Sequence, residues 1–193
     1  NEGVIDFQDL VLNIFNGQME AKGSVAIINS LPNLSISYAI NNFNPQSALW
    51  YFFDYNNFKG YMSANGTISS TGYSIPTLLY NMTGNLNFVG KKVIFSGMDL
   101  SQIIKVTESG DALNLRMEAL RSNSVQGETV FDEVAGNLTF DKGLATLVNM
   151  SLATNRSRGF YSTQFDYINH LVNGKGKISF IPAGTVSAIN IDI

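Results

Sequence analysis

Cysteine is absent from the 193-residue chain, and histidine occurs only once. Without cysteine the chain has no disulfide, no thiolate zinc site, no iron–sulfur cluster and no thiol nucleophile. A single imidazole also excludes any metal site that needs two or three histidine ligands. The sequence therefore lacks the residues on which many metalloenzymes, redox proteins and thiol enzymes depend.

Charged residues are scarce, at 14% of the chain, and 15 acidic against 12 basic side chains give a formal net charge of −3. Nucleic-acid-binding proteins usually have clustered Lys and Arg and an alkaline pI, whereas the pI here is about 5.0. We therefore expect no nucleic-acid partner. The longest nearly apolar stretch, residues 47–53, is much shorter than the roughly 18 residues that a membrane-spanning helix needs.

Most of the sequence alternates apolar and polar residues between glycine-containing turns, which is typical of antiparallel strands. Asn16-Gly17 is the clearest two-residue hairpin signal. Strands are predicted over 10–15, 18–28, 33–41, 60–69, 84–89, 91–96, 130–140, 144–153, 159–167, 174–181 and 185–193. Because this pattern starts at the first residues, without a signal sequence, we expect the chain to be a fragment of a longer protein.

Three segments depart from the strand pattern. Pro45 follows a polar cap and precedes a strongly apolar stretch, which predicts a helix over 45–54. A helical turn is predicted over 76–80. Apolar spacing near 3.6 residues predicts a helical insert over 99–122 between the two strand-rich parts.

No group of residues in the sequence predicts catalysis. His170 follows Asp166 closely, but no nucleophile or second base accompanies the pair, so a solvated histidine is the better interpretation. Asp132 and Glu133 are adjacent, and neighbours on a strand point to opposite faces, so they would not converge on one bond. We expect no enzymatic activity, catalytic residue, metal or cofactor.

Apolar residues recur along two consecutive predicted strands. If the strands pair, the two rows form one surface, which is either an ordinary buried core or an open groove for an acyl chain. The candidate groove residues are Val130, Val134, Leu138 and Phe140 on the first strand, and Leu144, Val148, Met150 and Leu152 on the second.

Four segments carry a family resemblance. Residues 10–23 form a leucine-rich strand, a hairpin glycine and a second strand that ends in glycine. Residues 95–103 join a strand to a helix start at Gly97 and Asp99, residues 127–143 begin with Gly-x-Thr-x-Phe, and residues 174–180 are Gly-Lys-Gly-Lys-Ile-Ser-Phe. In this order, the segments resemble the C-terminal region of the AsmA family, whose relatives include TamB.

The resemblance implies a single AsmA-like C-terminal β domain over residues 1–193. It implies a mainly β fold, a curved antiparallel sheet shaped as an open groove or half-barrel, with a few short helices. It also implies a periplasmic protein of Gram-negative bacteria, anchored in the inner membrane by an upstream helix absent from this sequence. Members are thought to carry phospholipid in a hydrophobic β-groove towards the outer membrane, so the expected partners are phospholipid or another acyl-chain lipid, and other envelope proteins.

Two alternatives to a lipid groove remain at this point. The first is a structural or protein-interaction domain whose sheet is closed over its own core, for instance by the 45–54 helix. The second is a carbohydrate-binding β-sandwich, which we rank last because Trp50, Tyr51 and Tyr55 are better explained as parts of a helix packed on the sheet. A charged residue at Val134 or Met150 should abolish lipid association if the groove hypothesis holds.

Overall fold

The structure, a computed structural model, describes residues 3–102, 127–155, 157–169, 171–172, 177–182 and 189–192. These residues form one sheet in which all neighbouring strands are antiparallel. Its strands are β1 (Val4–Ile14), β2 (Gly17–Ile28), β3 (Leu31–Phe43), β4 (Phe58–Thr71), β5 (Thr83–Ser96), β6 (Glu128–Asp141), β7 (Leu144–Ala153), β8 (Ser157–Asp166), β9 (Leu171–Val172), β10 (Lys177–Pro182) and β11 (Ile189–Asp192).

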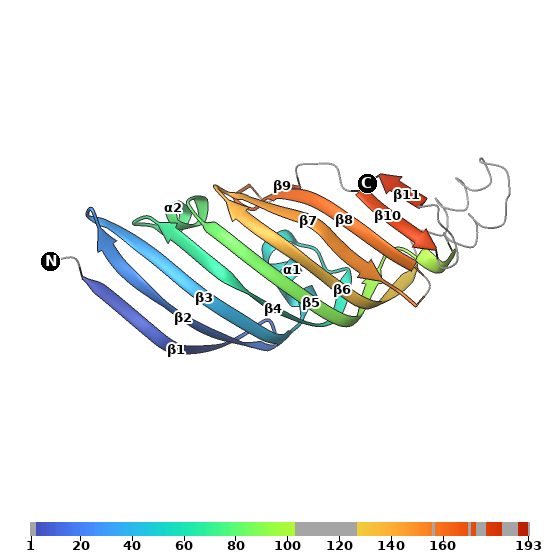
Figure 1. Ribbon diagram of the computed structural model, residues 1–193, viewed down its shortest axis with the longest axis horizontal. Helices are drawn as coiled ribbons and strands as arrows, with labels where there is room; N and C mark the ends of the chain where they lie inside the picture. Colours follow the sequence, from blue (N-terminus) through green and yellow to red (C-terminus); the bar gives the residue numbers. More distant parts are fainter. Residues whose placement is uncertain are drawn as a thin grey trace.

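The strands follow one another across the sheet in chain order from β1 to β8, then β10 and β11, and β9 pairs with β8 (Figure 1). The sheet is open, because β1 and β11 lie at opposite ends of this order and do not pair with each other. The predicted mainly β fold with an open antiparallel sheet is therefore confirmed.

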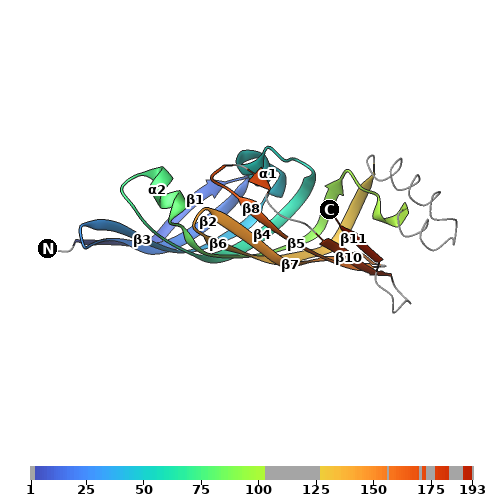
Figure 2. The same cartoon turned by 90° about the horizontal axis from the view of Figure 1, so that it is seen from above.

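Two short helices connect strands on the same side of the sheet (Figure 2). Helix α1 (Pro45–Phe53) begins where the Asn44 side chain accepts a hydrogen bond from the Gln46 amide at 2.9 Å, and it ends at Asp54 in the left-handed conformation. Helix α2 (Ile75–Tyr80) begins at Ser74 in the same way. Both predicted helices are confirmed, whereas the predicted insert over 99–122 lies outside the described residues beyond residue 102.

One predicted hairpin is wrong. Residues 84–89 and 91–96 do not pair with each other, because both belong to the continuous strand β5. Lys92 interrupts the regular strand geometry there with φ 54°, and Gly90 is buried beneath the Met62 and Val93 side chains. The break in alternation at 90–92 therefore marks a bend within one strand.

Similar irregularities occur along the sheet and bend its strands. The register shifts between Ile40 and Phe43 of β3, Lys59 and Tyr61 of β4, and Leu147 and Met150 of β7. Asn42, Gly60 and Asn149 have positive φ within these shifts. Bulges bend a strand and increase its twist, in keeping with the bent strands of Figure 1. They also change which residues face each side of the sheet.

The hydrophobic core lies where these bends bring the middle strands under α1 and residues 99–102. Phe131, Val134 and Val93 are at most 1% exposed, and Leu100 is 2% exposed. Other buried members are Phe43, Met62, Ala64, Leu147, Met150 and Leu152, with Phe15 of the first turn and Ala48 of α1 packed against them. No helix within the described residues is long and apolar enough to cross a membrane.

Candidate functional site

The two faces of the sheet differ chemically, and the strand register shows how far each face extends. Cross-strand partners in register share a face, so one row of positions runs from β1 to β11. Up to β6 it consists of Leu12, Met19, Ile40, Ala64, Phe88 and Gly136. The β6–β7 register shifts between Ala135 and Asn137, and beyond this shift the row resumes with Met150, Tyr161 and the register positions of Ile178 and Ile191. We call the side of the sheet that carries this row the apolar face.

Two further rows on the apolar face run parallel to the first. One contains Leu10, Ala21, Tyr38, Gly66, Leu86, Leu138 and Leu147, and the other contains Phe7, Gly23, Ile36, Ile68, Gly84, Phe140, Ala145 and Phe165. No Asp, Glu, Lys, Arg or His occurs in these three rows. The last of these rows keeps its register from β1 to β8, so the apolar face is uncharged across these eight strands, and in β8 the partner of Leu147 is the buried Thr163.

Two glycines on the apolar face lie beside aromatic rings. A Cβ atom at Gly136 would lie 2.6 Å from Cζ of Phe88, and one at Gly23 would lie 3.0 Å from Cζ of Phe7. At Gly136 the ring occupies the space that a larger residue would need, whereas at Gly23 the Ser35 carbonyl oxygen lies closer to that space than the ring does. These contacts keep the apolar face close-packed despite its glycines.

Tyr38 brings a polar group onto the apolar face without leaving it unsatisfied. Its hydroxyl passes over Gly66 and donates a hydrogen bond to the Asn85 carbonyl at 3.1 Å. Burial raises the pKa of the Tyr38 phenol to about 12, because the low-dielectric surroundings disfavour the phenolate. The group therefore remains neutral at physiological pH.

The opposite side of the sheet, the polar face, carries hydroxyl and amide side chains. One of its rows consists of Lys22, Ser37, Thr67, Asn85, Thr139, Thr146 and Gln164. Some of these groups bond across strands, as where Asn85 Nδ2 donates to Thr67 Oγ1 at 3.3 Å. The sheet is amphipathic as a whole. Contact with water is favourable for its polar face, whereas its apolar face is stabilised where other residues shield it from water.

The apolar face is shielded from solvent to different extents along the sheet. In the middle strands, Ala64 is 6% and Met150 9% exposed, whereas at the β1 end Leu12 is 40% and Ile5 70% exposed. Thr129 holds the segment that contains Leu100 against the sheet. Its hydroxyl accepts a hydrogen bond from the Leu100 amide at 2.9 Å and donates one to the Met98 carbonyl at 2.6 Å. The apolar face is therefore closed in the middle and open towards β1.

Comparison with known protein families gives a match over most of the chain. A model of the AsmA family matches residues 1–150 of the 193-residue chain. The chain belongs to the AsmA family. Membership associates it with the bacterial envelope and the biogenesis of the outer membrane. No curated protein and no solved structure matches the chain.

The eight groove residues predicted for this AsmA protein do not share one face. Val134, Leu138, Phe140, Met150 and Leu152 occupy the apolar face, whereas the alternation from their neighbours places Val130, Leu144 and Val148 on the other side. Val130 is 49% and Val148 52% exposed. The prediction of one continuous row was wrong for these three, because the strands change alternation near Asp132 and at Asn149.

Burial further separates the residues that remain on the apolar face. Val134 is 1%, Leu152 4% and Met150 9% exposed, so they belong to the closed core, while Leu138 and Phe140 are partly buried. Their predicted contact with lipid stays a prediction. The sequence interpretation missed Leu147 in β7 and the accessible residues of β1, of which Leu10 and Leu12 alternate in a recognisable way.

Trp50 and Tyr51 belong to α1, which packs on the core of the sheet through Ala48, as predicted. Their own side chains remain largely accessible, with Trp50 58% and Tyr51 74% exposed. Tyr55 is 38% exposed and its ring centroid lies 6.3 Å from that of Phe58. The outer side of α1 is therefore an aromatic surface.

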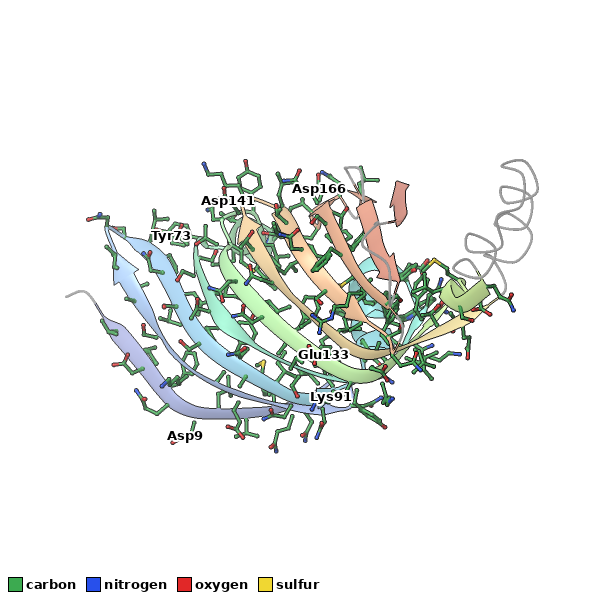
Figure 3. The ribbon with its side chains drawn as sticks, turned by 45° about the vertical axis from the view of Figure 1, so that its right-hand side comes forward. Asp9, Tyr73, Lys91, Glu133, Asp141 and Asp166 are labelled. Carbon is green, nitrogen blue, oxygen red and sulfur yellow. The ribbon has the colours of Figure 1, made fainter. Side chains whose placement is uncertain are left out.

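Two of the three acidic residues considered for catalysis, Asp132 and Asp166, have structural partners. Asp132 forms an ion pair with Lys92, and the Asp166 carboxylate accepts hydrogen bonds from the Ile168 and Asn169 amides at 3.1 and 2.9 Å. Figure 3 shows Asp166 beside Asp141 at one rim of the sheet and Glu133 towards the other. The described residues contain no group of three or more metal-ligating side chains, and His170 lies outside them.

Proposed function

We propose that this AsmA protein is a non-enzymatic module that carries phospholipid, or another acyl-chain lipid, between the inner and outer membranes. The observation that supports this proposal is the uncharged row of side chains that continues across every strand from β1 to β8. The family resemblance supports a periplasmic location, with an inner-membrane anchor outside this sequence.

The apolar face is suited to such a role because lipid movement through water is limited by the exposure of its chains. Removal of one methylene from water is favourable by about 0.8 kcal/mol. A carrier with a continuous apolar surface keeps the acyl chain of the lipid out of water as the lipid moves from one strand to the next. The process needs no bond to be made or broken, and hence no catalytic group.

The open part of the apolar face near β1 is where we place the acyl chain. Ile5, Leu10 and Leu12 are 70%, 39% and 40% exposed there, whereas Val134 is buried in the core. A lipid can contact the first three without displacing α1. We therefore transfer the proposed lipid contact from the β6 and β7 residues to β1 and its neighbours.

The test uses two substitutions at adjacent residues of β1. Leu12→Asp places a carboxylate on the apolar face, whereas Val11→Asp places one on the polar face, where Val11 is 54% exposed. The natively purified, detergent-free proteins are extracted with organic solvent, and phospholipid is quantified by mass spectrometry against an unrelated β protein. We expect stoichiometric lipid in the wild type and V11D and its loss in L12D. Equal lipid content in folded L12D and V11D would contradict the proposed site.

A second candidate function is a structural or protein-interaction domain in outer-membrane assembly. It is supported by the closed middle of the apolar face, where α1 and Leu100 cover the core. Absence of lipid from the wild type as well as from both variants would favour this function. Co-purification of another envelope protein would then identify the partner.

A further inference from the structure

The outer side of α1 borders a pocket to which the lipid proposal gives no role. The pocket is a shallow depression, widely open to solvent, with a volume of about 430 Å³. It is lined by Phe15, Gln46, Ser47, Trp50, Tyr51 and Asn56. Three of these side chains are aromatic, three are uncharged amides or hydroxyls, and none is Asp, Glu, Lys, Arg or His.

The pocket is built on fixed elements. Phe15 packs against the hydrophobic core, and its carbonyl accepts a hydrogen bond from the Asn44 amide at 2.7 Å. The ring of Phe15 also lies 6.0 Å, centroid to centroid, from that of Tyr51. The turn between β1 and β2 is thereby joined to α1 at both Asn44 and Tyr51.

We propose that this pocket binds an uncharged saccharide. A sugar ring has faces of C–H groups, which pack on aromatic rings, and a belt of hydroxyls, which both donate and accept hydrogen bonds. Trp50 and Tyr51, at 58% and 74% exposure, offer ring surface, and the amide of Gln46 supplies a carbonyl acceptor and two N–H donors. The proposal does not depend on lipid binding by the sheet.

A bilayer surface fits the same helix less well. Helices that lie on membranes are rich in Lys and Arg on their polar side, where they contact anionic headgroups. Helix α1 has no basic residue, and the exposed Asp54 that ends it is acidic. The mixture of aromatic rings with neutral hydrogen-bonding groups favours a neutral sugar over an anionic membrane.

Trp50 is the only tryptophan of the chain, so its fluorescence reports on the pocket directly. The 193-residue protein is titrated with chitotriose, which is N-acetylated, and with maltotriose, which is not. We expect a saturable change in Trp50 emission with at least one of them. Tyr51→Ala should weaken that binding about tenfold and Gln46→Ala about fivefold, whereas Tyr73→Ala, an exposed tyrosine outside the pocket, should leave it unchanged.

Three outcomes would overturn the proposal. The first is the absence of a saturable response to either sugar in the folded protein. The second is a response that both Y51A and Q46A retain, which would place the sugar elsewhere. The third is a blue shift of Trp50 emission with phosphatidylcholine–phosphatidylglycerol vesicles but no response to sugar, which would make the pocket a bilayer contact. Circular dichroism verifies that each variant is folded, and Q46A keeps the test decisive if Y51A does not fold.

Discussion

Val134 and Val130 provide a test of the bend in β6, because the same substitution should have very different costs at the two positions. Simple alternation along the strand places both valines on one face. In the structure, Val134 is 1% exposed within the core, whereas Val130 is 49% exposed on the other side of the sheet. The two residues differ in environment but not in chemistry.

The expected magnitude follows from the burial of each side chain. Val134→Ala removes two buried methyl groups and leaves a cavity, so it should lower the free energy of unfolding by about 2–3 kcal/mol. Val130→Ala removes the same atoms from a half-exposed site, which should cost less than about 1 kcal/mol. Urea unfolding followed by far-UV circular dichroism measures both values, provided that the slope m is unchanged. Equal costs for the two variants would refute the change of alternation.

Three further predictions concern single contacts. Gly136→Ala should destabilise the protein by about 1–3 kcal/mol, because the new Cβ would lie 2.6 Å from the Phe88 ring; urea unfolding measures this cost. Thr129→Val should cost about 1–3 kcal/mol by the same assay, because the buried Leu100 amide loses its acceptor. For Tyr38, whose folded pKa is raised to about 12 from 10.0, the contribution of the protonated phenol to stability should be complete below pH 10 and be lost as the pH rises towards 12; urea unfolding across that range measures the loss.

Each of these predictions has a matched control. Gly3→Ala introduces a Cβ with no atom within 4 Å and should be neutral. Thr139→Val acts on an exposed threonine of the polar face, whose hydroxyl bond to the Thr146 carbonyl is 3.4 Å long, and should cost little. Tyr38→Phe should remove the extra loss of stability above pH 10, and an unchanged pH dependence in that variant would assign the effect to another group.

Much of the fold could be predicted from local patterns because hairpins leave clear signals. The predicted hairpin lies between β1 and β2, although its two loop residues are Phe15 and Asn16 and Gly17 already pairs with Ile14. Pro45 begins α1, and Gly143 (φ 82°) closes the turn before β7. Each of these features depends on the conformational preference of one or two residues. Long-range pairing then follows from chain order, since consecutive strands are neighbours almost throughout the sheet.

The candidate site was harder to predict because bulges, rather than composition, decide which residues face the core. Lys92 adopts φ 54° at a position where nothing in the sequence signals a left-handed residue. Asn149 does so too, and asparagine tolerates this conformation better than most residues, so it offered a weak signal. Beyond each change of alternation, residues expected on one face of the sheet lie on the other. For this reason Val130 and Val148 do not lie in the predicted groove.

The closed middle and open β1 end of the apolar face together constrain any mechanism of lipid transfer. The uncharged row passes from the accessible Leu12 through Ala64 to the buried Met150, beneath the cover to which Ala48 of α1 belongs. A lipid that enters at β1 and crosses the whole sheet must therefore displace α1 from the core. If α1 stays in place, the proposed lipid site is confined to β1 and its neighbouring strands.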